Sequence, residues 1–306
     1  MKVLMISGDK NVLVPSTPAH ARLELQKKQV EKLEVVFWGR GALTSVFKIR
    51  ECFDVVTAQD PFWRGLAGFV LARRMRARLN VQVHADLVGQ SWLKKGIANF
   101  LLRRADSIRV VSQKIKGVLV AAGVRAPIHV LPIFIDVARF QNLQKKQHPK
   151  FAKVILWIGR LESEKNPAEA IEVLKEVRAK GIDAGLIFLG GGSLEHTLRA
   201  QAASLAQWVE FAGWQHDTLP YLAMADVELS TSRHESYGAS IIEALAAGVP
   251  VVSYDVGVAR DAGATIAPRG GLAKATVAAL QSGRRSTLQI SLLSADAWGP
   301  AWKETL

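Results

Sequence analysis

The chain of 306 residues has a single cysteine, Cys52, and no apolar stretch long enough to span a bilayer. One thiol excludes a disulfide framework and any metal site built from several thiolates. Cys52 itself is expected to be a small buried apolar residue. The apolar run at the N-terminus, Met1–Ile6, is too short for the core of a signal peptide. We therefore expect a cytoplasmic protein that is at most peripheral on the inner face of the membrane.

Acidic residues are scarce in the first half of the chain. Residues 1–150 carry 26 Lys and Arg against 10 Asp and Glu, whereas residues 151–306 carry 14 against 17. This asymmetry indicates that the first half faces an anionic partner. Nucleic acid is the less expected partner, because no recognised binding motif is present and aromatic residues are not interleaved with the basic ones.

An anionic membrane surface is another partner that the basic half would suit. The segment Phe62–Leu79 is predicted to be helical, with an apolar first half and four arginines in its second half. Those arginines would be distributed around the helix, so the pattern is not that of a clean interfacial helix. A core helix with a cationic last turn explains the segment equally well.

Short runs rich in Val and Ile alternate with segments of helical length along both halves of the chain. Near-continuous apolar strands that alternate with helices are typical of parallel sheets covered on both faces. The alternation is interrupted only by a polar stretch that contains a proline, as in an interdomain linker. We therefore expect an α/β protein with two Rossmann-like domains, at residues 1–140 and 153–290, joined by a linker at residues 141–152. A C-terminal helix at residues 291–306 can cross back to the first domain.

A candidate phosphate-binding loop follows the first strand of the second domain, at residues 159–166. Open α/β sheets bind ligands at the carboxyl ends of their strands. Gly159 allows a close approach of the backbone, and Arg160 and Lys165 supply two cations suited to a diphosphate. An ordinary loop in which these cations pair with Glu162 and Glu164 explains the same residues about as well.

A second candidate segment, residues 234–244, follows a later strand and leads into a helix. The small residues Gly238 and Ala239 lie where the helix begins, so free amides and the helix dipole would form an anion site. Glu235 and Glu243 flank that site. Two carboxylates near bound phosphate are tolerable if they accept hydrogen bonds from sugar hydroxyls. Acids that simply favour the helix dipole are the alternative, a reasonable one for Glu235 and a weaker one for Glu243.

In combination these motifs resemble the retaining glycosyltransferases of the GT-B fold, specifically glycosyltransferase family 4 (GT4). Glu235 and Glu243 match its E-x7-E motif, and the loop at 159–166 resembles its G-R-L…E-K segment. Three further matches lie in the same order along residues 154–254, namely Val209–Gly213, Ala225–Val227 and Ala247–Val252. The first half resembles the family more loosely, and its first loop has one glycine, Gly8, where the family has a glycine-rich loop.

The resemblance implies two Rossmann-like domains that face each other across a cleft where donor and acceptor meet. By this resemblance Arg160 and Lys165, with the helix start at Gly238 and Ala239, would hold the donor diphosphate. The resemblance also implies that Glu243 binds the ribose and that Glu235 and His84 contact the transferred sugar. Gly191 and Trp214 would border the nucleoside, and Gly8 would belong to the N-terminal loop. A satisfied core histidine explains His84 almost as well.

The activity implied by the resemblance is transfer of a hexose from a UDP- or GDP-sugar to a glycan or lipid-linked acceptor, with retention of configuration. It also implies no cofactor and no essential metal. The sequence agrees, since it has no D-x-D triplet and no clustered His and Cys ligands. A catalytically inert GT-B scaffold, a sugar-nucleotide epimerase of the same fold and a basic nucleic-acid-binding protein are the alternatives.

Overall fold

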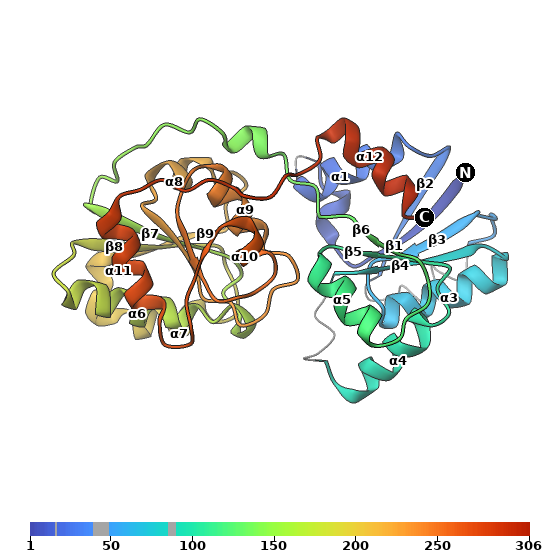
Figure 1. The fold of residues 1–306 in the computed structure, drawn as a ribbon, viewed down its shortest axis with the longest axis horizontal. Helices are drawn as coiled ribbons and strands as arrows, with labels where there is room; N and C mark the ends of the chain where they lie inside the picture. The colour runs from blue at the N-terminus through green and yellow to red at the C-terminus, as the bar shows by residue number, and fades with distance from the viewer. Residues whose placement is uncertain (16, 39–48, 85–89) are drawn as a thin grey trace. The chain divides into compact units, whose positions relative to one another are not determined.

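The computed structural model describes residues 1–15, 17–38, 49–84 and 90–306. The chain forms two compact units (Figure 1). Unit 1 comprises Met1–Phe134 together with Leu292–Leu306, and unit 2 comprises Ile135–Ser291. The first unit thus ends at Phe134, before the boundary at 140 that the sequence indicated, and the last residues of the chain belong to unit 1.

Unit 1 is built on a six-stranded sheet in which every pairing is parallel. The strands are rich in apolar side chains, and those at the centre of the sheet are buried on both faces, as expected for a parallel sheet between two helical layers. In spatial order they are β2 (Lys32–Phe37), β1 (Lys2–Ser7), β3 (Val55–Ala58), β4 (Arg78–Val83), β5 (Ser107–Val110) and β6 (Ile128–Val130).

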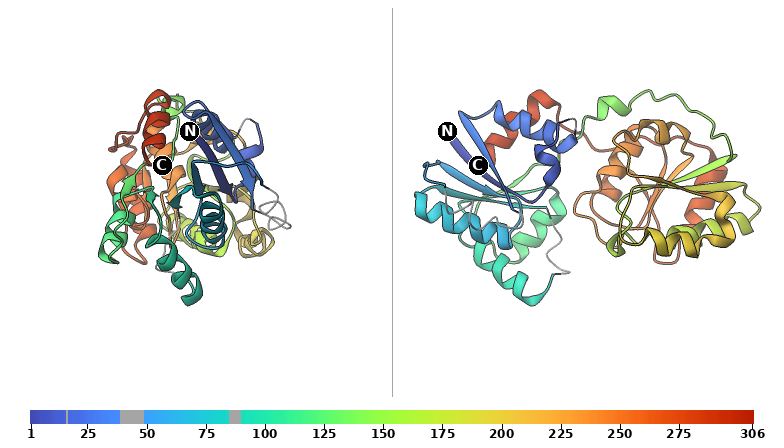
Figure 2. Two further views of the ribbon diagram at one scale, coloured as in Figure 1. Left: turned by 90° about the vertical axis from the view of Figure 1, so that its right-hand side faces the viewer. Right: turned by 180° about the vertical axis from the view of Figure 1, so that it is seen from behind.

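Helices cover both faces of the unit 1 sheet (Figures 1 and 2). One face carries α3 (Trp63–Met75), α4 (Trp92–Leu102) and α5 (Gln113–Ala121), and the other carries α1 (Pro18–Lys27) and α12 (Ala295–Glu304). On α12, Trp298 and Trp302 are almost fully buried against the strands. The C-terminal helix therefore contributes part of the core of unit 1, although it lies far from the rest of that unit in sequence.

Two expectations for unit 1 are wrong. Phe62–Leu79 is not one helix, because Arg76 adopts a left-handed conformation (φ 54°) that ends α3, and β4 begins at Arg78. Cys52 is exposed rather than buried. It lies just before β3, at a position where the neighbouring Phe53 takes the buried place.

Unit 2 has a second six-stranded sheet, again with parallel pairings. Its central strands are buried and mostly apolar, and one of them carries a buried acidic side chain that is described below. In spatial order the strands are β12 (Thr265–Ile266), β11 (Val251–Ser253), β10 (Val227–Ser230), β7 (Lys153–Ile158), β8 (Ala184–Leu189) and β9 (Val209–Gly213).

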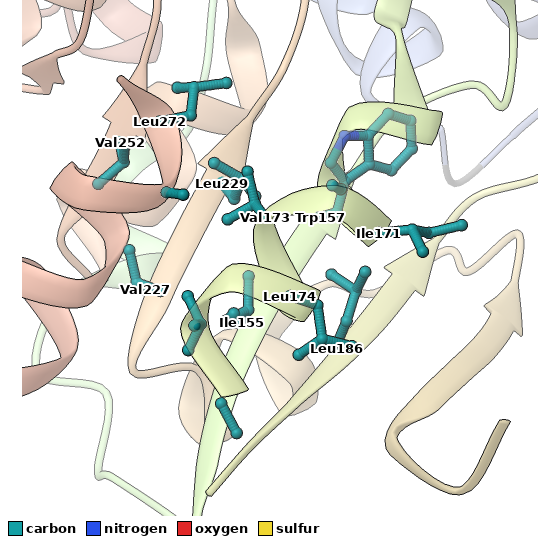
Figure 3. Close-up of a cluster of buried hydrophobic side chains, with 14 of the residues drawn as sticks. Ile155, Trp157, Ile171, Val173, Leu174, Leu186, Val227, Leu229, Val252 and Leu272 are labelled. Atoms are coloured by element: carbon teal, nitrogen blue, oxygen red, sulfur yellow. The ribbon is translucent and has the colours of Figure 1, made fainter. Parts of the chain in front are cut away.

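The larger core of unit 2 lies between this sheet and α6 (Pro167–Ala179), α7 (Glu195–Gln201) and α11 (Leu272–Ser282). Figure 3 shows Ile171 and Leu174 of α6 directed at the strands, close to Trp157 and Leu186. The opposite face carries α8 (Leu219–Met224), α9 (Ala239–Ala246) and α10 (Ala259–Ala262). The segment that holds the candidate site, α9, is therefore on the side of the sheet away from this core.

The composition of residues 141–152 suggested a linker between the two units, but these residues do not link them. They belong to unit 2, where the Lys146 amide donates to the Ala223 carbonyl oxygen at 2.8 Å and Phe151 is buried. The Lys145 ammonium also donates to two carbonyl oxygens at the end of α8. The polar composition reflects a segment that runs along the surface of unit 2, and the chain passes between units at 134–135 and 291–292.

Candidate active site

The candidate site of unit 2 lies where the order of its strands reverses. From β7 the chain proceeds through β8 to β9 at one edge of the sheet, whereas β10, β11 and β12 continue toward the other edge. The adjacent strands β7 and β10 thus form a topological switch point, the place where open α/β sheets bind ligands outside their carboxyl ends. The two candidate loops follow these two strands, at residues 159–166 and 231–238.

The structure brings Lys165 and Glu235 together. The Lys165 ammonium donates a hydrogen bond to Glu235 Oε1, which also accepts one from the Ser232 hydroxyl at 2.9 Å. Both partners are largely sheltered, with side-chain exposures of 20% for Lys165 and 15% for Glu235. A cation and a carboxylate that lie 70 residues apart in sequence are therefore held side by side at the switch point.

Two residues that the sequence analysis missed hold this pair in place. The Thr231 hydroxyl donates to the Lys165 carbonyl oxygen at 2.9 Å and accepts from the indole N–H of Trp157 at 2.9 Å. Trp157 is 2% exposed and belongs to the core of β7. The hydrogen bonds fix the main chain at Lys165 against the end of β10, so the backbone that carries the ammonium is held by buried side chains.

Arg160 is not brought to this pair. Its guanidinium donates to Glu164 Oε1 at 2.6 Å, and its side chain is 67% exposed. This is the loop pairing that the sequence left open as an alternative for Arg160. For Lys165 the same alternative is wrong, because its partner is Glu235 on the other loop rather than a neighbouring acid.

The predicted helix start is present at Gly238. This residue occupies the N-cap position of α9 with φ 94°, and among the residues that the structure describes no side chain caps the helix. Because the first N–H groups of a helix have no acceptor within it, the amides of the first turn of α9 are available to an anion at this end. Gly257 packs against the turn, where a Cβ would come within 2.3 Å of the Tyr237 carbonyl oxygen.

Glu243 lies inside α9 and faces the loop that follows β9. The Thr218 hydroxyl donates to its Oε2 at 3.2 Å, and burial raises the pKa of Glu243 to about 7. The same β9 loop presents Trp214, which is 58% exposed and stacks edge-on against His216. Gly191 lies on the adjacent β8 loop, where its carbonyl oxygen accepts from the Leu161 amide at 3.0 Å.

A buried acid under this site is unexpected from the sequence. Glu228 is 1% exposed on β10, in a position where its neighbours Val227 and Leu229 face the core on the other side of the sheet. Burial raises the pKa of Glu228 to about 8. The Ser240 hydroxyl and the Lys165 ammonium favour the charged form and so lower this pKa, but their effect is smaller than that of burial. Glu228 is therefore mostly protonated at neutral pH. Its only signal in the sequence is a charge inside an otherwise apolar strand.

The two predicted residues of the N-terminal half, Gly8 and His84, line one cavity of about 310 Å³ in unit 1. Gly8 follows β1, and His84 follows β4. The strand order of unit 1 reverses between β1 and β3, so the cavity lies beside the switch point of this sheet as well. The cavity thus brings together two predicted residues that are distant in sequence.

Hydrogen bonding defines the tautomer of His84. Its Nε2 lies 3.1 Å from Gln82 Oε1, an oxygen that also accepts from the Arg109 guanidinium at 3.1 Å. Because that oxygen is an acceptor, Nε2 carries the proton and Nδ1 is left as an acceptor. Burial, and then the positive charges of Arg109 and Arg22, lower the pKa of His84 to about 3. The ring is therefore a neutral imidazole at physiological pH.

Outside the gaps at 16, 39–48 and 85–89, no group of three or more His, Cys, Asp or Glu side chains is placed to hold a metal ion. In the same ranges no helix combines the length and the apolar character needed to cross a bilayer.

Two family models match the chain, one for each unit. A model for the glycosyl transferase 4-like domain matches residues 8–133, and the model for glycosyl transferases group 1 matches residues 138–266. The chain belongs to the group 1 family of glycosyltransferases. The resemblance to GT4 that was read from the motifs is confirmed, and the second model spans both loops of the unit 2 site.

Known relatives are similar over part of their length. The 2-deoxystreptamine glucosyltransferase of Streptomyces kanamyceticus is 28% identical over 72% of this chain and 65% of its own. The alpha-monoglucosyldiacylglycerol synthase of Streptococcus pneumoniae is 25% identical over 66% of this chain and 52% of its own. The chain thus spans between half and two thirds of the length of these relatives.

Solved structures confirm the fold. HepE of Anabaena, crystallised with UDP, superposes with a TM-score of 0.72 over 100% of this chain and 99% of its own, at 18% identity. Sucrose-phosphate synthase of Thermosynechococcus elongatus gives a TM-score of 0.70 at 16% identity, over 92% and 89% of the two chains. The group 1 glycosyltransferase has the two-domain α/β architecture of the GT-B fold.

Proposed function

We propose that this protein transfers a hexose from a nucleoside diphosphate sugar to an acceptor hydroxyl, with retention of configuration and without a metal ion. The observation that carries the proposal is the meeting of Lys165 and Glu235 beside the uncapped start of α9, at the switch point of unit 2. Support for a UDP-linked donor comes from the relatives, which include a glucosyltransferase and a protein crystallised with UDP.

The chemistry follows from the charges at the site. In the transition state, negative charge accumulates on the departing diphosphate, and an ammonium with free helix amides stabilises that charge in place. Lys165 and the amides at Gly238 and Ala239 supply these groups. Glu235 accepts hydrogen bonds from hydroxyls of the transferred sugar, and the leaving phosphate takes the proton of the acceptor.

Arg160 has a different part in this proposal. In the structure its guanidinium pairs with Glu164 at the surface, where an ion pair contributes little stability. A diphosphate binds a guanidinium more strongly than one exposed carboxylate does, because two charged oxygens can accept from the fork. We expect Arg160 to exchange Glu164 for the donor when the donor binds. Glu243 would accept from the ribose hydroxyls, with Gly191 and Trp214 beside the nucleoside.

The test is a transfer assay with UDP- and GDP-hexoses, read by release of nucleotide, with and without a chelator. Lys165→Met should lower kcat/KM by about 100-fold, since one well-placed donor to the developing charge stabilises it by about 3 kcal/mol. Lys175→Met is the matched control, because Lys175 is also ion-paired, to Glu172 on the surface of α6. Equal turnover in the two variants, or loss of activity with the chelator, would contradict the proposal.

We propose that membrane association is through α4. Trp92 is 83% exposed there, and Leu93 and Phe100 are exposed beside it, next to Lys94 and Lys95. Apolar side chains among lysines are what an anionic interface binds. Flotation with phosphatidylglycerol vesicles tests this part. Trp92→Ser should reduce binding several-fold, whereas Leu293→Ser, at another exposed apolar residue, should not.

A further inference from the structure

Three arginines line the cavity of unit 1 that contains Gly8 and His84. They are Arg22 of α1, Arg64 of α3 and Arg109 of β5, and the only acidic side chain in the described lining is Asp9. The cations come from three separate elements and converge on about 310 Å³. Such a concentration of guanidinium groups in a concave site is typical of recognition of phosphate or carboxylate.

Arg109 is built into the sheet. It is 3% exposed, and its guanidinium donates to three neutral oxygens, on the Gln82 side chain and on the main chain at Leu131 and Pro132. It also lies 5.3 Å from the ring of Trp298. These contacts hold the group rigidly, so its position against the cavity is preset.

Arg64 lies directly against the first loop. A Cβ on Gly8 would come within 2.0 Å of the carbon of its guanidinium, so a larger residue at position 8 would displace the end of the Arg64 side chain. Asp60 accepts a hydrogen bond from Arg64 Nη1 and orients it. Asp60 is in turn fixed by the Phe62 amide, which donates to its other oxygen at 2.8 Å. The one glycine of the first loop thus serves the placement of a cation at the cavity.

Arg22 is the cation with the least compensation. It is half-buried, and within residues 1–15, 17–38, 49–84 and 90–306 no hydrogen bond or ion pair to its guanidinium is present. Burial lowers the pKa of Arg22 below its usual range, with Asp9 acting in the opposite direction. Placing a charge in a sheltered position is costly unless an opposite charge joins it. An anionic ligand would supply that charge.

From this arrangement we infer that the cavity of unit 1 binds a phosphate or carboxylate group carried by the acceptor substrate. This inference rests on the proposed transferase function and specifies the acceptor as an anion. The donor has its own cation and helix start in unit 2, which leaves the arginines of unit 1 to the second substrate. His84 Nδ1, an acceptor on a neutral ring, would receive a hydrogen bond from an acceptor hydroxyl beside the anionic group.

The test is calorimetric titration of the full chain with glucose 6-phosphate, glucuronate, glucose and inorganic phosphate. The two anionic sugars, glucose 6-phosphate and glucuronate, should bind at least tenfold more tightly than glucose, and glucose 6-phosphate more tightly than inorganic phosphate. Arg22→Gln should remove most of this preference and leave UDP binding unchanged. Arg125→Gln, at an exposed arginine of the same unit, is the matched control and should bind like the original protein.

A second experiment distinguishes an anionic group on a lipid from one on a free sugar. Arg22-dependent binding of phosphatidylglycerol vesicles, with weak binding of glucose 6-phosphate, would assign the site to a lipid headgroup. Tight binding of glucose 6-phosphate, with weak binding of the vesicles, would assign it to a free anionic sugar. Both support an anionic acceptor.

The inference is overturned if the Arg22→Gln variant binds every probe as the original protein does. It is also overturned if the substitution weakens the binding of UDP as much as the binding of the two anionic sugars. Failure of both UDP and GDP to bind the original protein would contradict the proposed donor site instead, and would leave Arg22-dependent anion binding intact.

Discussion

Replacing Glu228 by Gln should make unit 2 more stable at neutral pH and remove part of its pH dependence. Glu228 is buried on β10, and its pKa is raised to about 8 from an ordinary value of 4.5. An acid with a raised pKa stabilises the folded state fully below its unfolded pKa. That stabilisation is lost as the pH rises toward the folded pKa, because the unfolded chain releases the proton first.

The size of the effect follows from the two pKa values. Each tenfold difference in proton affinity corresponds to about 1.4 kcal/mol, so between pH 5 and pH 7 the free energy of unfolding should fall by about 2.5 kcal/mol through Glu228 alone. Gln has nearly the same volume and no titration in this range. The stability difference between the variant and the original protein should therefore grow by about that amount over the same interval.

Hydrogen exchange of peptides from β10 and α9 measures this difference in unit 2 without a contribution from unit 1. The two proteins are compared at the same pH, so that intrinsic exchange rates cancel. The ratio of their protection factors should change by about 70-fold between pH 5 and pH 7. A ratio that stays constant with pH would refute the assignment of a raised pKa to Glu228.

Three further changes have defined outcomes. Gly190→Ala should destabilise unit 2 by several kcal/mol, measured by urea unfolding, because φ is 143° and a Cβ would lie 1.9 Å from the Gly159 carbonyl oxygen; an unchanged midpoint would contradict the geometry. Trp302→Ala should cost unit 1 about 3–5 kcal/mol as a fully buried side chain, and less than 1 kcal/mol would mean that α12 is not docked. Thr218→Val removes the donor to Glu243 and should raise the pKa of that carboxyl further, visible as an upward shift in the pH profile of donor binding.

The alternation of strands and helices was predictable because parallel strands buried on both faces are apolar without interruption. The candidate segments at 159–166 and 234–244 were predictable because they carry motif residues shortly after such strands. The partners that hold the site are less visible. Thr231 and Trp157 act through hydrogen bonds across 74 residues, and neither looks functional in isolation.

Other errors arose where composition was a poor guide to position. The polar stretch 141–152 resembles a linker, yet main-chain hydrogen bonds and Phe151 fasten it to unit 2. The charge asymmetry directed attention to the first half. It did not show that Arg22, Arg64 and Arg109 share a cavity, because they lie on three elements whose packing depends on the strand order.

The most direct measurement of the central claim is calorimetric titration of UDP and GDP into the full chain and into the Lys165→Met and Lys175→Met variants. One of the nucleotides should bind, and Lys165→Met should weaken it 10- to 100-fold, as expected for loss of a charge-assisted hydrogen bond of about 1.5–3 kcal/mol. Lys175→Met should leave the affinity unchanged. Equal affinity in all three proteins would show that the switch point of unit 2 does not hold the donor diphosphate.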